Sequence, residues 1–104
     1  MKDHSGSEPA MTDFADKVRH AAEAMRALFE PTPLQKNEHL SAKFGADIWL
    51  KREDLSPVRS YKLRGAFNAM SKVLAANPDQ QMFVCASAGN HAQGVALSCF
   101  KLGT

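Results

Sequence analysis

The sequence has few cysteines and no long hydrophobic run. Its 104 residues include only two cysteines, Cys85 and Cys99, which are far apart and form no CxxC motif. This spacing excludes a disulfide-dense small domain and predicts neither a metal site nor a redox motif, because those sites need closely spaced ligands. We expect both cysteines to be buried free thiols in a reducing compartment. No segment approaches the ~18 apolar residues that span a bilayer.

A strong excess of charge of one sign is also missing. Thirteen Lys and Arg residues stand against eleven Asp and Glu residues, for a formal net charge of +2. The basic residues that lie closest together are Lys51, Arg52, Arg59, Lys62 and Arg64. Glu53 and Asp54 lie within this cluster, whereas a nucleic-acid-binding face needs a larger basic excess and interleaved aromatic residues. We therefore expect neither a nucleic-acid partner nor a membrane partner.

Residues 1–11 lack the apolar core of a targeting signal. They are mostly small and polar and include Pro9, so we predict a disordered tail. The whole chain is 44% hydrophobic and 23% charged, which is ordinary for a globular protein. We predict a cytoplasmic protein with a tail at residues 1–11 and a folded region at residues 12–104.

Hydrophobic periodicity predicts a first long helix over residues 13–30. Its apolar stripe is formed by Phe14, Val18, Ala21, Met25 and Leu28. Thr12 is a suitable N-cap, and Pro31 ends the helix. Residues 38–44 predict a shorter helical turn that ends at Gly45.

Two further helices are predicted in the second half of the chain. The first covers residues 61–76, with Ser60 as its N-cap. Its apolar face is formed by Leu63, Phe67, Met70 and Leu74. Residues Asn77 to Asp79 end it. The second covers residues 92–102 and stops at Gly103.

Three short segments predict strands. They are residues 34–37, residues 47–53 and the apolar segment 81–86, which is typical of a buried parallel strand. Strands that alternate with helices favour an α/β fold. We therefore predict a partial open parallel sheet with flanking helices.

The segment from Ser60 to Ala66 carries the first candidate for chemistry. Lys62 lies in the first turn of a predicted helix, where the positive end of the helix dipole disfavours a cation. A neutral amine is the form that attacks a carbonyl to make an imine. Gly65 inside the helix costs about 1 kcal/mol relative to Ala, which suggests that another group approaches closely there. A lysine at a helix start is a solvated side chain most of the time. Ordinary helix packing explains Gly65 equally well.

The segment from Ala86 to Gly94 carries the second candidate, because it joins a predicted strand to a predicted helix. Free amides at a helix N-terminus form a ready site for a carboxylate or a phosphate. Gly89 allows a tight turn, while Ser87 and Asn90 add polar side chains. An ordinary capped turn is the open alternative. We interpret His91 as a structural hydrogen-bonding residue rather than a general base, since no carboxylate partner is evident nearby.

Taken together, three segments resemble the fold-type II pyridoxal-phosphate enzymes. They are Leu50–Asp54, Ser60–Ala66 and Ala86–Gly94, and Thr32-Pro33-Leu34 fits the same pattern. Within that group the sequence is most similar to threonine dehydratases, also called threonine ammonia-lyases. The resemblance runs from about Phe29 to Gly103.

The resemblance implies a cofactor, a reaction and a set of site residues. Lys62 would form the Schiff-base link to pyridoxal 5′-phosphate, and Asn90 would lie against the cofactor's 3′-oxygen. The substrate carboxylate would be bound by the loop residues Ser87, Ala88, Gly89, Asn90 and His91. The implied reaction converts L-threonine into 2-oxobutanoate and ammonia, the entry to isoleucine synthesis, with a homo-oligomer expected for the full-length enzyme.

Serine dehydratase, serine racemase and a non-catalytic remnant of the family stay open as alternatives. Serine racemases of this fold carry a serine where this chain has Ala88, so the resemblance favours elimination. The family's phosphate-binding loop is Gly-rich, and the six glycines here form no such run. We therefore expect residues 12–104 to be the N-terminal part of the catalytic domain, ending before that loop. Weak or no activity is expected for the isolated chain.

Overall fold

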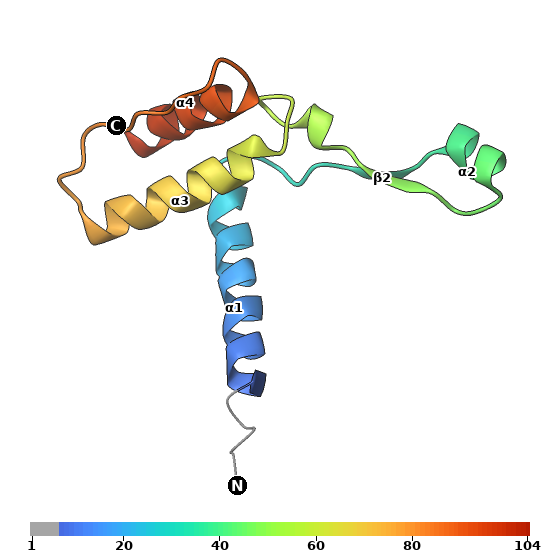
Figure 1. Ribbon diagram of the computed structural model, residues 1–104, viewed down its shortest axis with the longest axis horizontal. Helices are drawn as coiled ribbons and strands as arrows, with labels where there is room; N and C mark the ends of the chain where they lie inside the picture. Colours follow the sequence, from blue (N-terminus) through green and yellow to red (C-terminus); the bar gives the residue numbers. More distant parts are fainter. Residues whose placement is uncertain (1–6) are drawn as a thin grey trace, which may run out of the picture.

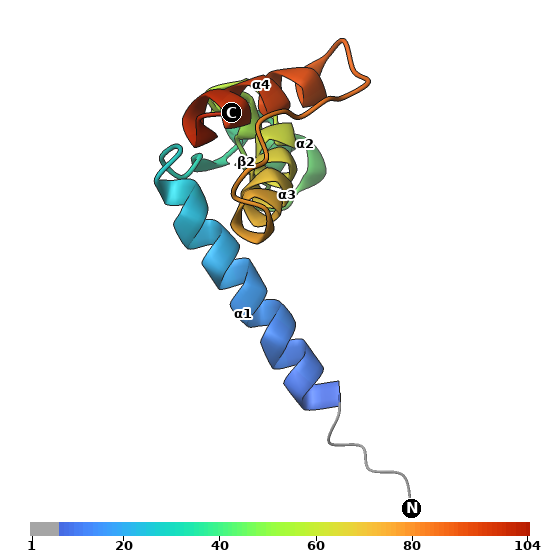
Figure 2. The same cartoon turned by 90° about the vertical axis from the view of Figure 1, so that its left-hand side faces the viewer.

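The computed structural model describes the backbone of residues 7–104 and the side chains from residue 13 onward. In chain order the elements are α1 (Ser7–Arg26), β1 (Leu34–Lys36), α2 (Glu38–Phe44), β2 (Trp49–Lys51), a 3₁₀ turn η1 (Glu53–Leu55), α3 (Lys62–Ala76) and α4 (Asn90–Leu102). Helices α3 and α4 lie side by side, α1 projects away from them, and the β1–β2 hairpin with α2 extends to another side (Figures 1 and 2). The radius of gyration is 18.0 Å, against about 13 Å for a compact domain of this length. Much apolar surface therefore stays uncovered.

Helix α1 begins earlier and ends earlier than the sequence predicts. It starts at Ser7, so residues 7–11 of the predicted tail are helical and Thr12 is not its N-cap. Residues 1–6 of that tail lie outside the described residues. The predicted stripe packs only at its C-terminal end, where Met25 and the following Leu28 are buried. Phe14 and Val18 are 65% and 51% exposed because α1 extends beyond α3 (Figure 2).

The only sheet among the described residues is an antiparallel hairpin. Leu34 pairs with Lys51, and Lys36 pairs with Trp49. The connection reverses the chain through α2, which is capped by the Asn37 side chain and ends at Gly45 in the left-handed conformation. The helical turn at residues 38–44 is confirmed. Both strands form, but each is shorter than the predicted 34–37 and 47–53.

The predicted parallel sheet is not formed in the described residues. Segment 81–86 is not a strand, and its side chains Met82 and Val84 are 71% and 88% exposed. The physical reason is that a parallel strand exists only when a neighbouring strand pairs with its backbone. The described part of the chain offers no such neighbour, because β1 and β2 pair with each other.

The core lies where α1, α3 and α4 meet. The face predicted for α3 is confirmed at Leu63, Phe67 and Met70, which are all buried, with Leu63 fully enclosed. Met25 and Leu28 pack against it from the end of α1. Helix α4 begins at Asn90, two residues before its predicted start, and ends at Gly103 as predicted.

The two cysteines differ from the sequence-based expectation. Both are free thiols, but Cys85 is exposed and Cys99 is only half-buried. Cys85 belongs to segment 81–86, so its exposure has the same cause as the missing strand. Within residues 7–104, none of the helices combines the length and the apolar composition needed to cross a bilayer.

Candidate functional site

A short hydrogen-bonded turn positions the start of α3. The Ser56 hydroxyl accepts a hydrogen bond from the Ser60 N–H at 3.1 Å and donates one to the Ser60 carbonyl at 2.8 Å. Arg59 sits between them in the left-handed conformation, with φ of 62°. The N-cap position is Tyr61 rather than the predicted Ser60, whose hydroxyl accepts only a long 3.4 Å bond from the Lys62 N–H. The turn is nonetheless closed on itself, so it fixes the direction in which α3 leaves.

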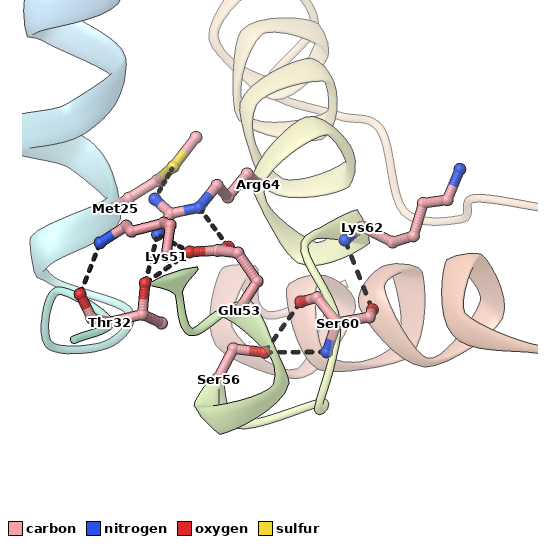
Figure 3. Close-up of polar contacts among 8 residues, drawn as sticks. All are labelled: Met25, Thr32, Lys51, Glu53, Ser56, Ser60, Lys62 and Arg64. Atoms are coloured by element: carbon pink, nitrogen blue, oxygen red, sulfur yellow. Dashed lines mark hydrogen bonds and ion pairs between the residues drawn. The ribbon is translucent and has the colours of Figure 1, made fainter. Parts of the chain in front are cut away.

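Lys62 is the first residue of α3, and its side chain is exposed. Its chain extends away from the neighbouring ion pair of Arg64 (Figure 3). The amine lies 5.1 Å from the centroid of the Tyr61 ring. Lys62 takes part in none of the ion pairs formed by side chains from residue 13 onward. The amine is therefore accessible to a molecule that approaches the start of α3.

A hollow of about 310 Å³ adjoins Lys62. It is lined by Tyr61, Lys62, Arg64, Gly65, Ala66 and His91. This volume falls at the lower end of the range for small-molecule sites, about 300–1,000 Å³. A Cβ atom at Gly65 would meet nothing within 4 Å, so no protein group makes the close approach that the sequence suggested. Gly65 instead lines this hollow without contributing a side chain to it.

A second hollow of about 230 Å³ continues along α3 and α4. It shares Gly65, Ala66 and His91 with the first, and segment 83–85 lines its outer side. The two hollows therefore lie next to each other, and His91 borders both of them.

The loop before α4 has the geometry of an anion site. The Ser87 hydroxyl accepts hydrogen bonds from the N–H groups of Gly89 at 3.2 Å and Ala92 at 3.3 Å. Gly89 occupies the N-cap position without a side-chain cap. The first amides of a helix have no partner within that helix, so those of Asn90 and His91 suit a carboxylate.

The structure brings together some of the predicted site residues but not all. His91 lines the same hollow as Lys62. Ser87, Ala88, Gly89 and Asn90 are exposed on the loop that precedes it and do not line that hollow. The lysine and the loop therefore meet at one place, the first turn of α4.

Sequence reasoning missed the ion pair between Arg64 and Glu53. Together with Thr32, this pair links three of the segments that carry the family resemblance. Arg64 donates from Nε to Glu53 Oε2 at 2.7 Å and from Nη2 to Glu53 Oε1 at 2.9 Å (Figure 3). The Thr32 hydroxyl donates to Glu53 as well, and the Lys51 amine donates to the Thr32 carbonyl. The guanidinium of Arg64 also lies 5.2 Å from the centroid of the Phe29 ring. Arg64 therefore ties α3 to the end of α1 and to the β2–η1 turn.

These pairs neutralise much of the basic cluster. The Arg64 hydrogen bonds hold the pKa of the Glu53 carboxyl below its ordinary value, although partial burial opposes them. Arg52 donates two bonds to Asp54, at 2.9 and 2.8 Å, and lowers the pKa of that carboxyl. Glu53 and Asp54 therefore each pair with a basic residue of the cluster, which argues against a nucleic-acid footprint.

Comparison with known proteins gives a family. Residues 25–104 match the sequence profile of the family described as "Pyridoxal-phosphate dependent enzyme". The chain belongs to this family. The match includes the lysine-bearing turn, the loop before α4 and the Arg64–Glu53 pair.

Several curated relatives are similar to this chain. The biosynthetic L-threonine dehydratase IlvA of Bacillus subtilis is 58% identical over 72 residues, which are 69% of this chain and 17% of that protein. Chloroplastic threonine dehydratase 1 of Solanum lycopersicum is 56% identical over 75 residues, 69% of this chain and 12% of that protein. The Mycobacterium bovis IlvA is 45% identical over 100 residues, 93% of this chain and 22% of that protein. The chain thus spans less than a quarter of the length of these relatives.

The residues present fit the reactive end of the family's cofactor. Pyridoxal phosphate carries an aldehyde, and the accessible Lys62 amine beside an open hollow is the group that an aldehyde requires. Gly65 adjoins this hollow, and the space beside its Cα is open, since a Cβ atom there would meet nothing within 4 Å. No Gly-rich run for the phosphate occurs among residues 7–104.

Proposed function

We propose that this chain carries the lysine-bearing part of a pyridoxal-phosphate-dependent threonine dehydratase. The reaction is the conversion of L-threonine into 2-oxobutanoate and ammonia, at the entry to isoleucine synthesis. The observation that carries the proposal is the accessible Lys62 amine on a hollow bordered by the first turn of α4. The family membership and the names of the relatives support the choice of reaction.

In this proposal Lys62 has two roles. Its Nζ would hold the cofactor covalently, and the amine, released when the substrate amine takes its place, would accept the proton from the substrate α-carbon. When bound, the cofactor supplies an electron sink for the pair left on that carbon. Asn90, at the start of α4, would lie beside the cofactor's 3′-oxygen. The β-hydroxyl of the substrate leaves, and hydrolysis then releases ammonia.

The loop Ser87–His91 holds the substrate carboxylate. The amides of Asn90 and His91 donate to it, at the positive end of the α4 dipole. Ser87 keeps the loop closed through its bonds to Gly89 and Ala92. This arrangement orients the amino acid so that its α-proton faces Lys62.

Ala88 favours elimination over racemisation. Racemisation needs an acid on the face of the substrate opposite the lysine, and a methyl side chain has no proton to give. Serine dehydration uses the same groups, so it stays the second candidate for substrate. Serine racemisation is disfavoured by Ala88.

We also propose how the chain fits into the family's fold. Segment 81–86 would add as a strand to a parallel sheet, which would cover the exposed Met82 and Val84. The protein would act as a homo-oligomer in the cytoplasm. The name of the tomato relative assigns that protein to the chloroplast, so a plastid is the other compartment to test.

Trapping the cofactor tests the central assignment. The purified protein is incubated with pyridoxal phosphate, reduced with borohydride, digested and mapped by mass spectrometry. We expect the pyridoxyl group on Lys62 and much less on Lys72, an exposed lysine of the same helix. Lys62→Ala should lose the label, whereas Lys72→Ala should keep it. In a full-length protein that carries this segment, Lys62→Ala should also abolish turnover and Lys72→Ala should retain it. Absence of preferential label on Lys62 contradicts the proposal and supports a non-catalytic remnant.

A further inference from the structure

Helix α4 crosses α3 directly over the peptide that carries the lysine. A Cβ atom added at Gly94 would lie 3.1 Å from the Leu63 nitrogen, 3.2 Å from the Leu63 Cα and 3.2 Å from the Lys62 carbonyl carbon. All three are backbone atoms, so no flexible side chain stands between the two helices here. The backbone of α4 therefore contacts the backbone of Lys62 and Leu63.

The residues around this crossing are tightly packed. Leu63 and Ser98 are both completely buried beside it, and Gly94 is buried as well. The Ser98 hydroxyl donates a 2.7 Å hydrogen bond to the Gly94 carbonyl, which satisfies its only donor inside α4. Protein interiors are close-packed, so an added methyl group moves backbone instead of filling a void.

Gly94 also lies one turn after the start of α4, on the same face as Asn90. The crossing point and the first turn of α4 thus belong to the same helix, which directly follows the loop. The crossing therefore lies between the backbone of Lys62 and the amides at the start of α4.

We propose that Gly94 is a positioning residue for Lys62. Its missing side chain lets α4 seat against the Lys62–Leu63 peptide, which fixes the amine relative to the loop Ser87–His91. This inference rests on the proposed function, because it concerns the distance between the groups that hold cofactor and substrate. Gly94 itself touches neither.

The test compares two lysines on one helix. Protein treated with limiting pyridoxal phosphate and borohydride is digested, and the ratio of label on Lys62 to label on Lys72 is measured. Gly94→Ala should lower this ratio about tenfold, since displacement of a reactive group by a fraction of an ångström to 1 Å costs rate factors of this order. Ala96→Gly is the matched control, because Ala96 is an exposed residue of α4 away from the crossing. It changes helix propensity and should leave the ratio within about twofold of wild type.

Both lysines are exposed in the folded protein, so general loss of structure removes any preference between them. A wild-type ratio in a folded Gly94→Ala variant overturns the inference. If far-UV circular dichroism shows that Gly94→Ala is unfolded, Ser98→Ala decides, because it removes a buried hydroxyl beside the crossing and so leaves the packing there less complete without adding volume. A ratio about threefold lower then supports the inference, and an unchanged ratio overturns it. If wild type itself shows no preference for Lys62, the proposed function fails instead.

Discussion

Arg64 and Glu53 form a forked ion pair that joins the first turn of α3 to the turn after β2. Both guanidinium–carboxylate bonds are short, at 2.7 and 2.9 Å, and the two side chains are only 35% and 20% exposed. Arg64 is two residues from Lys62. The pair therefore anchors the turn that presents the lysine, on the side opposite to the amine (Figure 3).

Glu53→Gln should destabilise the protein by about 1 kcal/mol, because it removes the charge from a bidentate, partly buried pair. The free energy of unfolding is measured by urea denaturation. Asp54→Asn is the matched control. It breaks the Arg52–Asp54 pair, which is more exposed, and should give no measurable change. Equal effects of the two variants would contradict the role given to Arg64.

The contribution of this pair should depend on pH. Arg64 lowers the pKa of Glu53 in the folded state, so the unfolded state binds a proton more readily. The stabilisation is complete above the unfolded carboxyl pKa of about 4.3 and is lost as pH falls through the lower folded pKa. The stability difference between wild type and Glu53→Gln should therefore shrink between about pH 5 and pH 3. A difference that stays constant over that range would assign the effect to packing.

In a full-length protein that carries this segment, Asn90→Ala should change the absorbance spectrum of the bound cofactor and lower turnover roughly tenfold, as the loss of one hydrogen bond to a charged group does. The measurement is a visible spectrum together with steady-state rates. Gln93→Ala serves as the control, because Gln93 is an exposed residue of α4 that lies three residues after Asn90. It should keep the wild-type spectrum. A wild-type spectrum in Asn90→Ala would mean that the loop is structural only.

In a full-length protein that carries this segment, Ala88→Ser should introduce some racemisation, because it adds a hydroxyl proton within the substrate loop. Chiral chromatography of the amino acid recovered after partial turnover detects the D-enantiomer. Ala92→Ser, which adds the same hydroxyl inside α4, is the control and should give none. If Ala88→Ser also gives none, the opposite face of the substrate is supplied by other residues.

Local patterns in the sequence predict the helices well and the sheet poorly. The buried face of Leu63, Phe67 and Met70 follows from spacing alone, because apolar residues three and four positions apart fall on one side of an α-helix. Segment 81–86 was predicted as a buried strand from composition, yet a strand depends on partners that spacing along one chain does not reveal.

The candidate site shows the same division. Lys62 and the loop Ser87–His91 are recognisable from their neighbours in sequence. The Arg64–Glu53 pair and the contact of Gly94 with Leu63 are not, because they join segments far apart along the chain. Gly65 was interpreted as a point of close approach, whereas Gly94 makes that approach. Both are helical glycines, so only the crossing of the two helices distinguishes them.

The left-handed turn at Arg59 has a consequence for protein engineering. A residue with a Cβ atom loses roughly 1–2 kcal/mol in that conformation, and the two hydrogen bonds between Ser56 and Ser60 enclose it. The feature of position 59 that shapes this turn is its left-handed backbone conformation, not the charge of its side chain. Glycine or asparagine at position 59 would preserve the path of the chain into the lysine-bearing helix at lower conformational cost.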